Sequence, residues 1–289
     1  MLKFIIIGSL TENTQDLLDA IEKAGHQGIV CKFSEITFET IGDNLAAMCG
    51  ELDICDFDVV IFRGYNNHIY EAQLLAEMLV DNDKIVIEQS LAGGYVRGKM
   101  HQAKRLFECG IDHPATFQAN NFEGWKRLTE DVEFPIIAKP IFGRKGRGIQ
   151  KLNTANEALE FFEKNTTEYL AQQYFPIVND FRIFVVGGEV IGGFQRFINE
   201  GQYKSNIRGT KAEKIEVSVE MKKVALESTA AMDYEIAGVD LFEYEGKTYV
   251  IEVNVSPQWE KFKLITGINP AEYIIKYAIK KRQKQHKSV

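Results

Sequence analysis

Short apolar runs alternate with helical segments through the N-terminal third of the chain, and this alternation restricts the fold more than any other feature. Leu2 to Ile7 is an apolar run that ends at Gly8, and leucines and isoleucines recur at helical spacing between Thr14 and Ala24. The pattern repeats with a run from Asp58 to Phe62 and a helical segment from Tyr70 to Val80. Such runs are typical of parallel strands that helices cover on both faces. The sequence therefore predicts an α/β unit with a mostly parallel sheet.

Beyond this unit the sequence changes character. Ala92-Gly93-Gly94 interrupts the alternation, so we place a domain boundary near residue 95. Two later pairs of apolar segments are each joined by a short turn sequence: Phe181 to Val186 with Val190 to Phe197, and Val239 to Tyr244 with Thr248 to Val253. Each pair is typical of a β-hairpin. We therefore expect α/β structure at the N-terminus and α+β structure with antiparallel sheets in the C-terminal part.

Composition excludes several classes of protein. The net charge of −7 and the pI of 5.4 argue against a nucleic-acid-binding surface. No stretch approaches the length of a membrane span, and the apolar run Leu2 to Ile7 is too short for the core of a signal peptide. The four cysteines, Cys31, Cys49, Cys55 and Cys109, form no CxxC pair, so the sequence predicts neither a disulfide framework nor a zinc site. We expect a cytoplasmic protein that binds neither nucleic acid nor membrane.

A glycine-rich basic segment, residues 143–148, lies between two predicted strands. Gly143, Gly146 and Gly148 allow backbone N–H groups to approach an anion, and Arg144 adds positive charge. The spacing matches neither a Walker loop nor a dinucleotide-binding fingerprint. A hairpin turn without a ligand explains the same pattern. The segment alone therefore leaves phosphate binding and an ordinary turn both open.

Two lysines precede this segment. Lys139 ends the apolar run that begins at Ile136, where a buried cation is costly unless an anion matches it. Lys99 opens a predicted helix. Alternation along the strand equally permits a solvent-facing Lys139, and Lys99 can be solvated at the helix start. Both lysines are candidates for contact with a phosphate.

Three oxygen-bearing side chains converge on the last predicted hairpin. Glu252 and Asn254 lie two residues apart and therefore on one face of a strand, and Asp240 lies across the hairpin within about one residue of register. Ligation by oxygen alone suits Mg²⁺. A polar outer face of the hairpin is the alternative. The apolar flanks, Ala237 to Val239 and Tyr249 to Ile251, favour burial and hence a metal site.

Charged residues are dense between the Gly-rich segment and this hairpin. Arginine forks match oxyanions with paired hydrogen bonds, so these arginines suit a phosphoryl or acyl-phosphate group. A surface salt-bridge network fits the same composition. The residues concerned are Asp180, Arg182, Arg196, Lys204, Ser205, Asn206 and Arg208.

The order of these residues resembles that of the RimK-like ATP-grasp ligases, a family that includes the ligase that adds glutamate to the C-terminus of a ribosomal protein. The resemblance covers most of residues 95 to 280. Its motifs, in order, are Phe134 to Pro140 with the glycine-rich segment, Asp180 to Gly188, Lys204 to Asn206, and Ala237 to Asp240 followed by Glu252 to Pro257. The resemblance implies an ATP-grasp fold with an N-terminal α/β domain in residues 1–95, a lid subdomain in 96–170 and a C-terminal subdomain with the metal site in 171–289.

The resemblance also implies roles for individual residues. Residues 173–175 would offer backbone groups to adenine, and the glycine-rich segment would cover the phosphates. The implied ATP-binding residues are Lys99, Lys139, Gly143, Arg144, Gly146, Gly148, Gln173, Tyr174, Phe175, Asp180, Lys204, Ser205 and Asn206. The residues implied near the acyl phosphate are Arg182, Arg196 and Arg208, and the implied metal ligands are Asp240, Glu252 and Asn254.

The reaction that the resemblance implies is ATP-dependent formation of an amide through an acyl phosphate. Mg²⁺ is the expected metal, with Mn²⁺ as an alternative. The expected acceptor is the carboxylate of a peptide C-terminus or a small molecule, and the expected amine is glutamate. We also expect a homo-oligomer.

Three departures from the family pattern bear on the substrate. Gln173 stands where these ligases commonly carry Glu, Lys204 replaces an Arg, and Gln258-Trp259 follows Pro257 where Gly is usual. A ligase with another amino acid, a carrier protein or a peptide as substrate is therefore one alternative. A non-catalytic nucleotide-binding module is the other, and the intact metal-ligand set argues against it.

Overall fold

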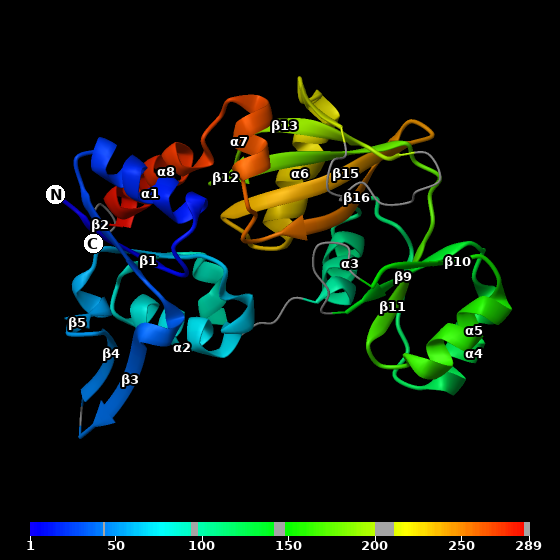
Figure 1. Cartoon of the computed structure of the whole chain (residues 1–289), viewed down its shortest axis with the longest axis horizontal. Helices are drawn as coiled ribbons and strands as arrows, with labels where there is room; N and C mark the ends of the chain where they lie inside the picture. Colours follow the sequence, from blue (N-terminus) through cyan, green and yellow to red (C-terminus); the bar gives the residue numbers. More distant parts are fainter. Residues whose placement is uncertain (43, 94–97, 142–147, 200–210, 286–289) are drawn as a thin grey trace.

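The structure is a computed structural model that describes residues 1–42, 44–93, 98–141, 148–199 and 211–285. Its three larger sheets lie side by side, and Figure 1 shows the N-terminal sheet at the left, a five-stranded sheet in the middle and a smaller lobe at the right. Most of the functional residues predicted from the sequence lie on the five-stranded sheet and the smaller lobe.

The N-terminal sheet has four strands in the order β2-β1-β6-β7, and all three pairings are parallel. The strands are β1 (Lys3–Ile7), β2 (Gln27–Cys31), β6 (Val59–Phe62) and β7 (Ile85–Ile87). Their side chains are apolar on both faces, because helices cover the sheet on each side. The predicted parallel α/β unit is confirmed.

Three helices cover this sheet. Helix α2 (Ile69–Asp81) packs on one face, whereas α1 (Glu12–Lys23) and α8 (Pro270–Gln285) pack on the other. Helix α8 comes from the C-terminal end of the chain and lies against α1 (Figure 1). The chain therefore returns to its starting sheet, which ties the last segment to the first.

A small antiparallel sheet projects from the N-terminal unit, at the lower left of Figure 1. Its strands are β3 (Ile36–Ile41), β4 (Asn44–Cys49) and β5 (Leu52–Asp53). A disulfide joins Cys31, at the end of β2, to Cys49 of β4. The prediction that the cysteines form no disulfide was wrong, because the antiparallel pairing of β3 with β4 brings Cys49 back toward the end of β2.

The right-hand lobe is a four-stranded sheet in the order β10-β9-β11-β8. Helices α4 and α5 cover one face of it, where the rings of Trp125 and Phe162 stack with centroids 3.6 Å apart. The elements are β8 (Thr116–Phe117), α4 (Phe122–Asp131), β9 (Ile136–Pro140), β10 (Gln150–Leu152), α5 (Ala155–Lys164) and β11 (Tyr169–Gln173). Helix α3 (Lys99–Glu108) precedes the lobe and packs near β16.

The central sheet is antiparallel, in the order β14-β13-β12-β15-β16. Both predicted hairpins are confirmed, as β12 with β13 and β15 with β16. The elements are β12 (Asn179–Val186), β13 (Glu189–Phe197), β14 (Ala212–Ile215), α6 (Val219–Ala231), β15 (Ile236–Tyr244), β16 (Lys247–Asn254) and α7 (Glu260–Thr266).

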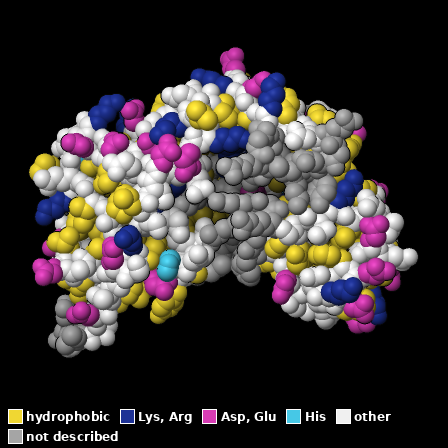
Figure 2. Space-filling view, in the orientation of Figure 1, with side chains coloured by type: hydrophobic (Ala, Val, Ile, Leu, Met, Phe, Trp, Pro, Cys, Tyr) yellow, Lys and Arg dark blue, Asp and Glu magenta, His cyan; other side chains and the backbone are white. Residues whose placement is uncertain are grey.

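Helix α6 covers the apolar face of this sheet, and the opposite face carries the charged residues. On the surface shown in Figure 2, basic and acidic side chains are interspersed. Among the described residues, no helix is long and apolar enough to cross a membrane.

Candidate functional site

A large cavity of about 1240 Å³ lies between the three main sheets. Its walls come from the ends of the N-terminal strands, from β9 and β11 of the lobe and from the charged face of the central sheet. This volume exceeds that of a typical small-ligand pocket, so it has room for a nucleotide and a second substrate. The predicted site residues that line it are Lys99, Lys139, Gln173, Tyr174, Phe175, Asp180, Arg182, Arg196, Asp240, Glu252 and Asn254.

Other predicted residues lie outside the described parts of the chain. These are Gly143, Arg144, Gly146, Lys204, Ser205, Asn206 and Arg208. Gly148 is described, and it has a positive φ of 74°. A Cβ atom at this position would lie 2.9 Å from Pro140 Cγ and 3.0 Å from the Tyr169 hydroxyl. This conformation, with so little room, requires glycine.

Strand register brings the charged residues onto one face of the central sheet. Asp240 pairs directly with Glu252 on the neighbouring strand and with Arg182 on the other side. Asn254 pairs with Gly238, two residues further along the same hairpin. Paired residues in a sheet point to the same face. The convergence of Asp240, Glu252 and Asn254 that the sequence predicts is therefore present.

Asp240 is held by two arginines. Arg182 donates from Nε to Asp240 Oδ1 and from Nη2 to Oδ2, the latter at 2.7 Å, and Arg196 Nη2 lies 2.9 Å from Oδ1. Arg196 Nε in turn donates to Asp180 Oδ1 at 2.6 Å. Burial opposes ionisation of Asp240, but Arg182 and Arg196 outweigh it, so the pKa of Asp240 lies below its ordinary value. The carboxylate is charged and fixes both guanidinium groups.

The same ion pairs change the pKa of Arg196 in the opposite direction from that of Asp240. Burial alone would lower the pKa of Arg196, yet the carboxylates of Asp240 and Asp180 raise it above its ordinary value. Both carboxylates and the Arg196 side chain are nearly inaccessible to solvent. Buried charges of this kind are stable only as a matched network. Asp180 therefore lies in an ion pair with Arg196 at the cavity wall.

Glu252 is the acidic group that faces the lysines. It accepts a hydrogen bond from Asn254 Nδ2 at 3.0 Å, and Asn254 Nδ2 also lies 3.3 Å from the Gly238 carbonyl oxygen. These bonds occupy the amide nitrogen of Asn254 and leave its oxygen as an acceptor. Glu252 and Asn254 thus offer two oxygen ligands from one strand.

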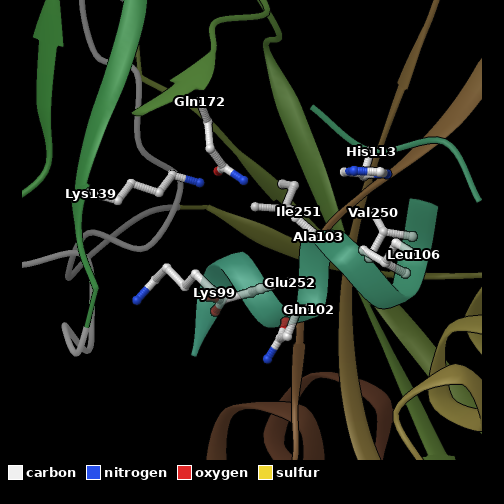
Figure 3. Close-up of a pocket in the computed structure, with 10 residues that line it drawn as sticks. All are labelled: Lys99, Gln102, Ala103, Leu106, His113, Lys139, Gln172, Val250, Ile251 and Glu252. Carbon is white, nitrogen blue, oxygen red and sulfur yellow. The ribbon is translucent and has the colours of Figure 1, made fainter. Parts of the chain in front are cut away.

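Lys99 of α3 and Lys139 of β9 line one pocket together with Glu252 of β16 (Figure 3). Lys99 Nζ donates to the carbonyl oxygen of Pro140 at 3.0 Å. Burial lowers the pKa of Lys99, and the Glu252 carboxylate acts in the opposite direction. Burial, with a smaller contribution from the neighbouring Lys99, lowers the pKa of Lys139 to about 8 against the opposite effects of Glu252 and Asp240. Two half-buried lysines that share a pocket with Glu252 leave excess positive charge, which suits an anionic ligand.

Gln172 is a cavity residue that sequence reasoning missed. Its Nε2 donates to Thr116 Oγ1 at 2.9 Å, whereas its Oε1 is buried without a partner among the described residues. Figure 3 shows the side chain extending into the pocket beside Lys139. An unsatisfied buried acceptor is costly unless a ligand donates to it. The only signal in the sequence is the position of Gln172, directly before the predicted adenine-binding segment.

The segment Gln173 to Phe175 connects the lobe with the central sheet. Gln173 N donates to the Ala115 carbonyl oxygen at 2.8 Å, and the Phe175 carbonyl accepts from Ile177 N at 2.9 Å. The ring of Phe175 packs against Phe242, with centroids 5.0 Å apart. Part of the backbone predicted to contact adenine is therefore already hydrogen-bonded within the protein.

These residues fit a nucleotide with its magnesium ion. The ammonium groups of Lys99 and Lys139 suit phosphate oxygens, and the oxygens of Glu252 and Asn254 suit Mg²⁺. The buried Oε1 of Gln172 suits an amino group of a base. The lysines and the oxygen ligands thus match the phosphates and the magnesium ion, and the unpaired Oε1 of Gln172 matches the base of the same nucleotide.

The arrangement of lobe, central sheet and N-terminal parallel sheet defines the ATP-grasp class of ligases. The ATP-grasp ligase PsnB, complexed with minimal precursor, matches with a TM-score of 0.74 at 18% identity over 96% of this chain and 99% of that chain. The macrocyclase MdnC from Microcystis aeruginosa, bound with precursor peptide MdnA, gives 0.73 at 15% identity over 96% and 100%. D-alanine–D-alanine ligase from Bacillus anthracis, complexed with ATP, gives 0.66 at 18% identity over 99% and 100%.

Sequence similarity identifies the family within this class. The profile of the RimK-like ATP-grasp domain matches residues 96–278. The protein of Cellvibrio japonicus named "Probable alpha-L-glutamate ligase" is 31% identical over 272 residues, which cover 92% of this chain and 90% of that protein. The protein of the same name in Trichodesmium erythraeum is 27% identical over 272 residues, covering 92% and 91%. The chain belongs to the RimK-like ATP-grasp family and is a ligase.

Proposed function

We propose that this protein is an ATP- and Mg²⁺-dependent ligase that joins glutamate to a carboxylate acceptor through an acyl phosphate. One observation carries the proposal. Two half-buried lysines, the oxygen ligands Glu252 and Asn254, and two arginines held by ion pairs line the same cavity. Such a concentration of oriented charge is suited to stabilising a phosphoryl group in transfer and the acyl phosphate that results.

In this proposal each group has a separate role. Lys99 and Lys139 bind the ATP phosphates, and Glu252 with Asn254 and Asp240 holds Mg²⁺. The bound ion neutralises charge on the phosphate oxygens. Arg182 and Arg196 face the acyl phosphate. Because Asp240 and Asp180 already hold the two guanidinium groups, little reorganisation is needed when substrates bind.

The proposed reaction has two steps. A carboxylate oxygen of the acceptor attacks the γ-phosphorus of ATP, and ADP leaves. The amine of glutamate then attacks the carbonyl carbon of the acyl phosphate, and the carbon–oxygen bond breaks. Phosphate leaves with that oxygen, the amine loses a proton, and an amide remains. No covalent bond to the enzyme is required.

The relatives support the choice of substrates. Proteins named "Probable alpha-L-glutamate ligase" align with almost the whole chain, which supports glutamate as the amine. Solved neighbours of the same fold hold precursor peptides, which supports a peptide as the acceptor. We propose a peptide carboxylate for this reason.

The test is release of phosphate from ATP and Mg²⁺ with a panel of carboxylate acceptors, each with and without glutamate. Mass spectrometry then identifies the product. We expect phosphate release to require both substrates and one acceptor to gain glutamyl residues. ATP binding without turnover on any pair would contradict ligation and support the binding module.

A second candidate is closure of a peptide on itself, which the likeness to the macrocyclase MdnC favours. The same chemistry then uses an amine or hydroxyl of the peptide in place of glutamate. The two candidates differ in product mass, because ring closure removes one water per bond formed, whereas glutamylation adds a residue. The acceptor panel therefore separates them.

A further inference from the structure

The N-terminal half of the cavity contains a buried cation that the proposed mechanism does not use. Arg63 directly follows β6, and its backbone N donates to the Ile7 carbonyl oxygen at 2.8 Å. Arg63 is only 6% exposed, yet it lines the cavity. It therefore lies at the carboxyl ends of β1 and β6, the edge of a parallel sheet where ligands bind in open α/β folds.

Contacts with the loop after β16 fix the position of this side chain. Arg63 Nη2 donates to the Pro257 carbonyl oxygen at 2.7 Å, and the guanidinium carbon lies 4.4 Å from the centre of the Trp259 ring. The indole N–H of Trp259 donates to Asp16 Oδ2 at 2.9 Å, so the ring is itself held. The guanidinium is thus oriented before any ligand binds.

The charge of Arg63 has no direct partner in the described part of the chain. No carboxylate there lies within 4.0 Å of its guanidinium, and the bond to Pro257 is the only hydrogen bond that its side chain makes with described residues. Burial lowers the pKa of Arg63 to about 10, against the effects of Tyr65, Glu88 and Glu260, so it remains protonated at neutral pH. A guanidinium has five N–H groups, and a carbonyl with a ring face satisfies few of them.

We infer that Arg63 is the receptor for a carboxylate of the ligase substrates, at the end of the cavity formed by the N-terminal sheet. This inference rests on the proposed function. A carboxylate matches the planar fork with two hydrogen bonds. The negative charge of Glu260, which acts on Arg63, favours a singly charged group over a phosphate dianion.

Two substrates supply such a group. One source is a carboxylate of glutamate itself, and the other is a carboxylate on the acceptor that is not being ligated. Because both sources share the same chemistry, the experiment uses one probe for each. L-glutamate represents the amine substrate, and N-acetyl-L-glutamate, which has no free amine, represents the acceptor.

The experiment measures binding of both probes and of ADP with Mg²⁺ by calorimetry, in wild type and three variants. Arg63→Gln removes the charge, and Arg63→Lys keeps the charge without the fork. Ser256→Ala is the structural control, because it removes another contact between the same loop and the N-terminal unit, the bond from Gly64 N at 3.3 Å, and leaves Arg63 intact.

We expect Arg63→Gln to weaken one probe by about 10- to 100-fold, the loss of a charged hydrogen-bond pair, with Arg63→Lys intermediate. ADP binding by all three variants, and probe binding by Ser256→Ala, should match wild type. The probe that is weakened identifies the source of the carboxylate.

Three results would overturn the inference: probe binding that Arg63→Gln leaves unchanged, equal losses in Arg63→Gln and Ser256→Ala, or wild-type protein that binds ADP and neither probe. Wild-type protein that fails to bind ADP would instead contradict the proposed function.

Discussion

At the scale of single residues, the proposed roles depend on how burial shifts protonation. The pKa of Lys139 is lowered to about 8 chiefly because the ammonium loses hydration in the cavity wall. In its ordinary state the side chain would stay charged far above neutral pH. Here it gains or loses its proton close to physiological pH, so the proposed binding of phosphate by Lys139 should depend on pH.

A titration of ATP affinity tests this role of Lys139. Phosphates favour the protonated form, so bound ATP raises the pKa of Lys139 and affinity falls as pH rises through about 8. We expect the dissociation constant to rise by up to about tenfold per pH unit above that point. Lys139→Arg, which keeps its proton, should show a smaller pH dependence than wild type, because only Lys99, whose pKa is also lowered, still titrates among the two positions. Equal pH profiles for both proteins would exclude Lys139 from the phosphate site.

Asp240 also has a role at this scale, because it links the metal-type ligands to the two arginines. Asp240→Asn removes the charge that holds Arg182 and Arg196, so we expect ligation to slow by at least about 100-fold. Glu243→Gln, an exposed position on the same strand, is the matched control and should ligate like wild type. If Asp240→Asn ligated at the wild-type rate at saturating Mg²⁺, Asp240 would have no role in the site.

At the scale of elements, alternation and turn chemistry predict much of the structure. The hairpins β12 with β13 and β15 with β16, and with them the pairing of Asp240 with Glu252, follow from local sequence. Strands β3 to β5 were missed, because Asn44 to Cys49 has no clear alternation of apolar and polar residues. Strand propensity depends strongly on packing context, so a short segment of this kind gives little local signal.

The disulfide between Cys31 and Cys49 gives this small sheet a test of its own. It closes a loop across 18 residues, which restricts the unfolded chain. We expect Cys49→Ser to lower the free energy of unfolding by about 2 to 3 kcal/mol in denaturant titrations. Cys109→Ser, at an exposed free thiol, is the control. Equal stabilities of wild type and Cys49→Ser under oxidising conditions would show that the two cysteines are not bonded.

At the scale of the whole molecule, the sequence predicts which residues belong to the site better than it predicts how the site is enclosed. Lys99, Glu252 and Arg196 were each predicted, but the contact of Arg63 with Pro257 and Trp259 joins residues about 200 positions apart. The packing of helix α8 on α1 was not predicted either. Long-range contacts of this kind leave no local pattern.

The domain boundaries, the homo-oligomeric state and Mn²⁺ as an alternative metal stay predictions. The same holds for the residues of the two predicted loops that lie outside the described parts of the chain. The described residues that line the cavity come from all three sheets.

The central claim is that the acceptor carboxylate is activated as an acyl phosphate. The most direct measurement uses an acceptor found in the panel, labelled with oxygen-18 in the carboxylate that is ligated, together with ATP, Mg²⁺ and glutamate. The account predicts that one labelled oxygen passes to the phosphate released with each amide formed. Unlabelled phosphate, or release of pyrophosphate and AMP, would contradict it.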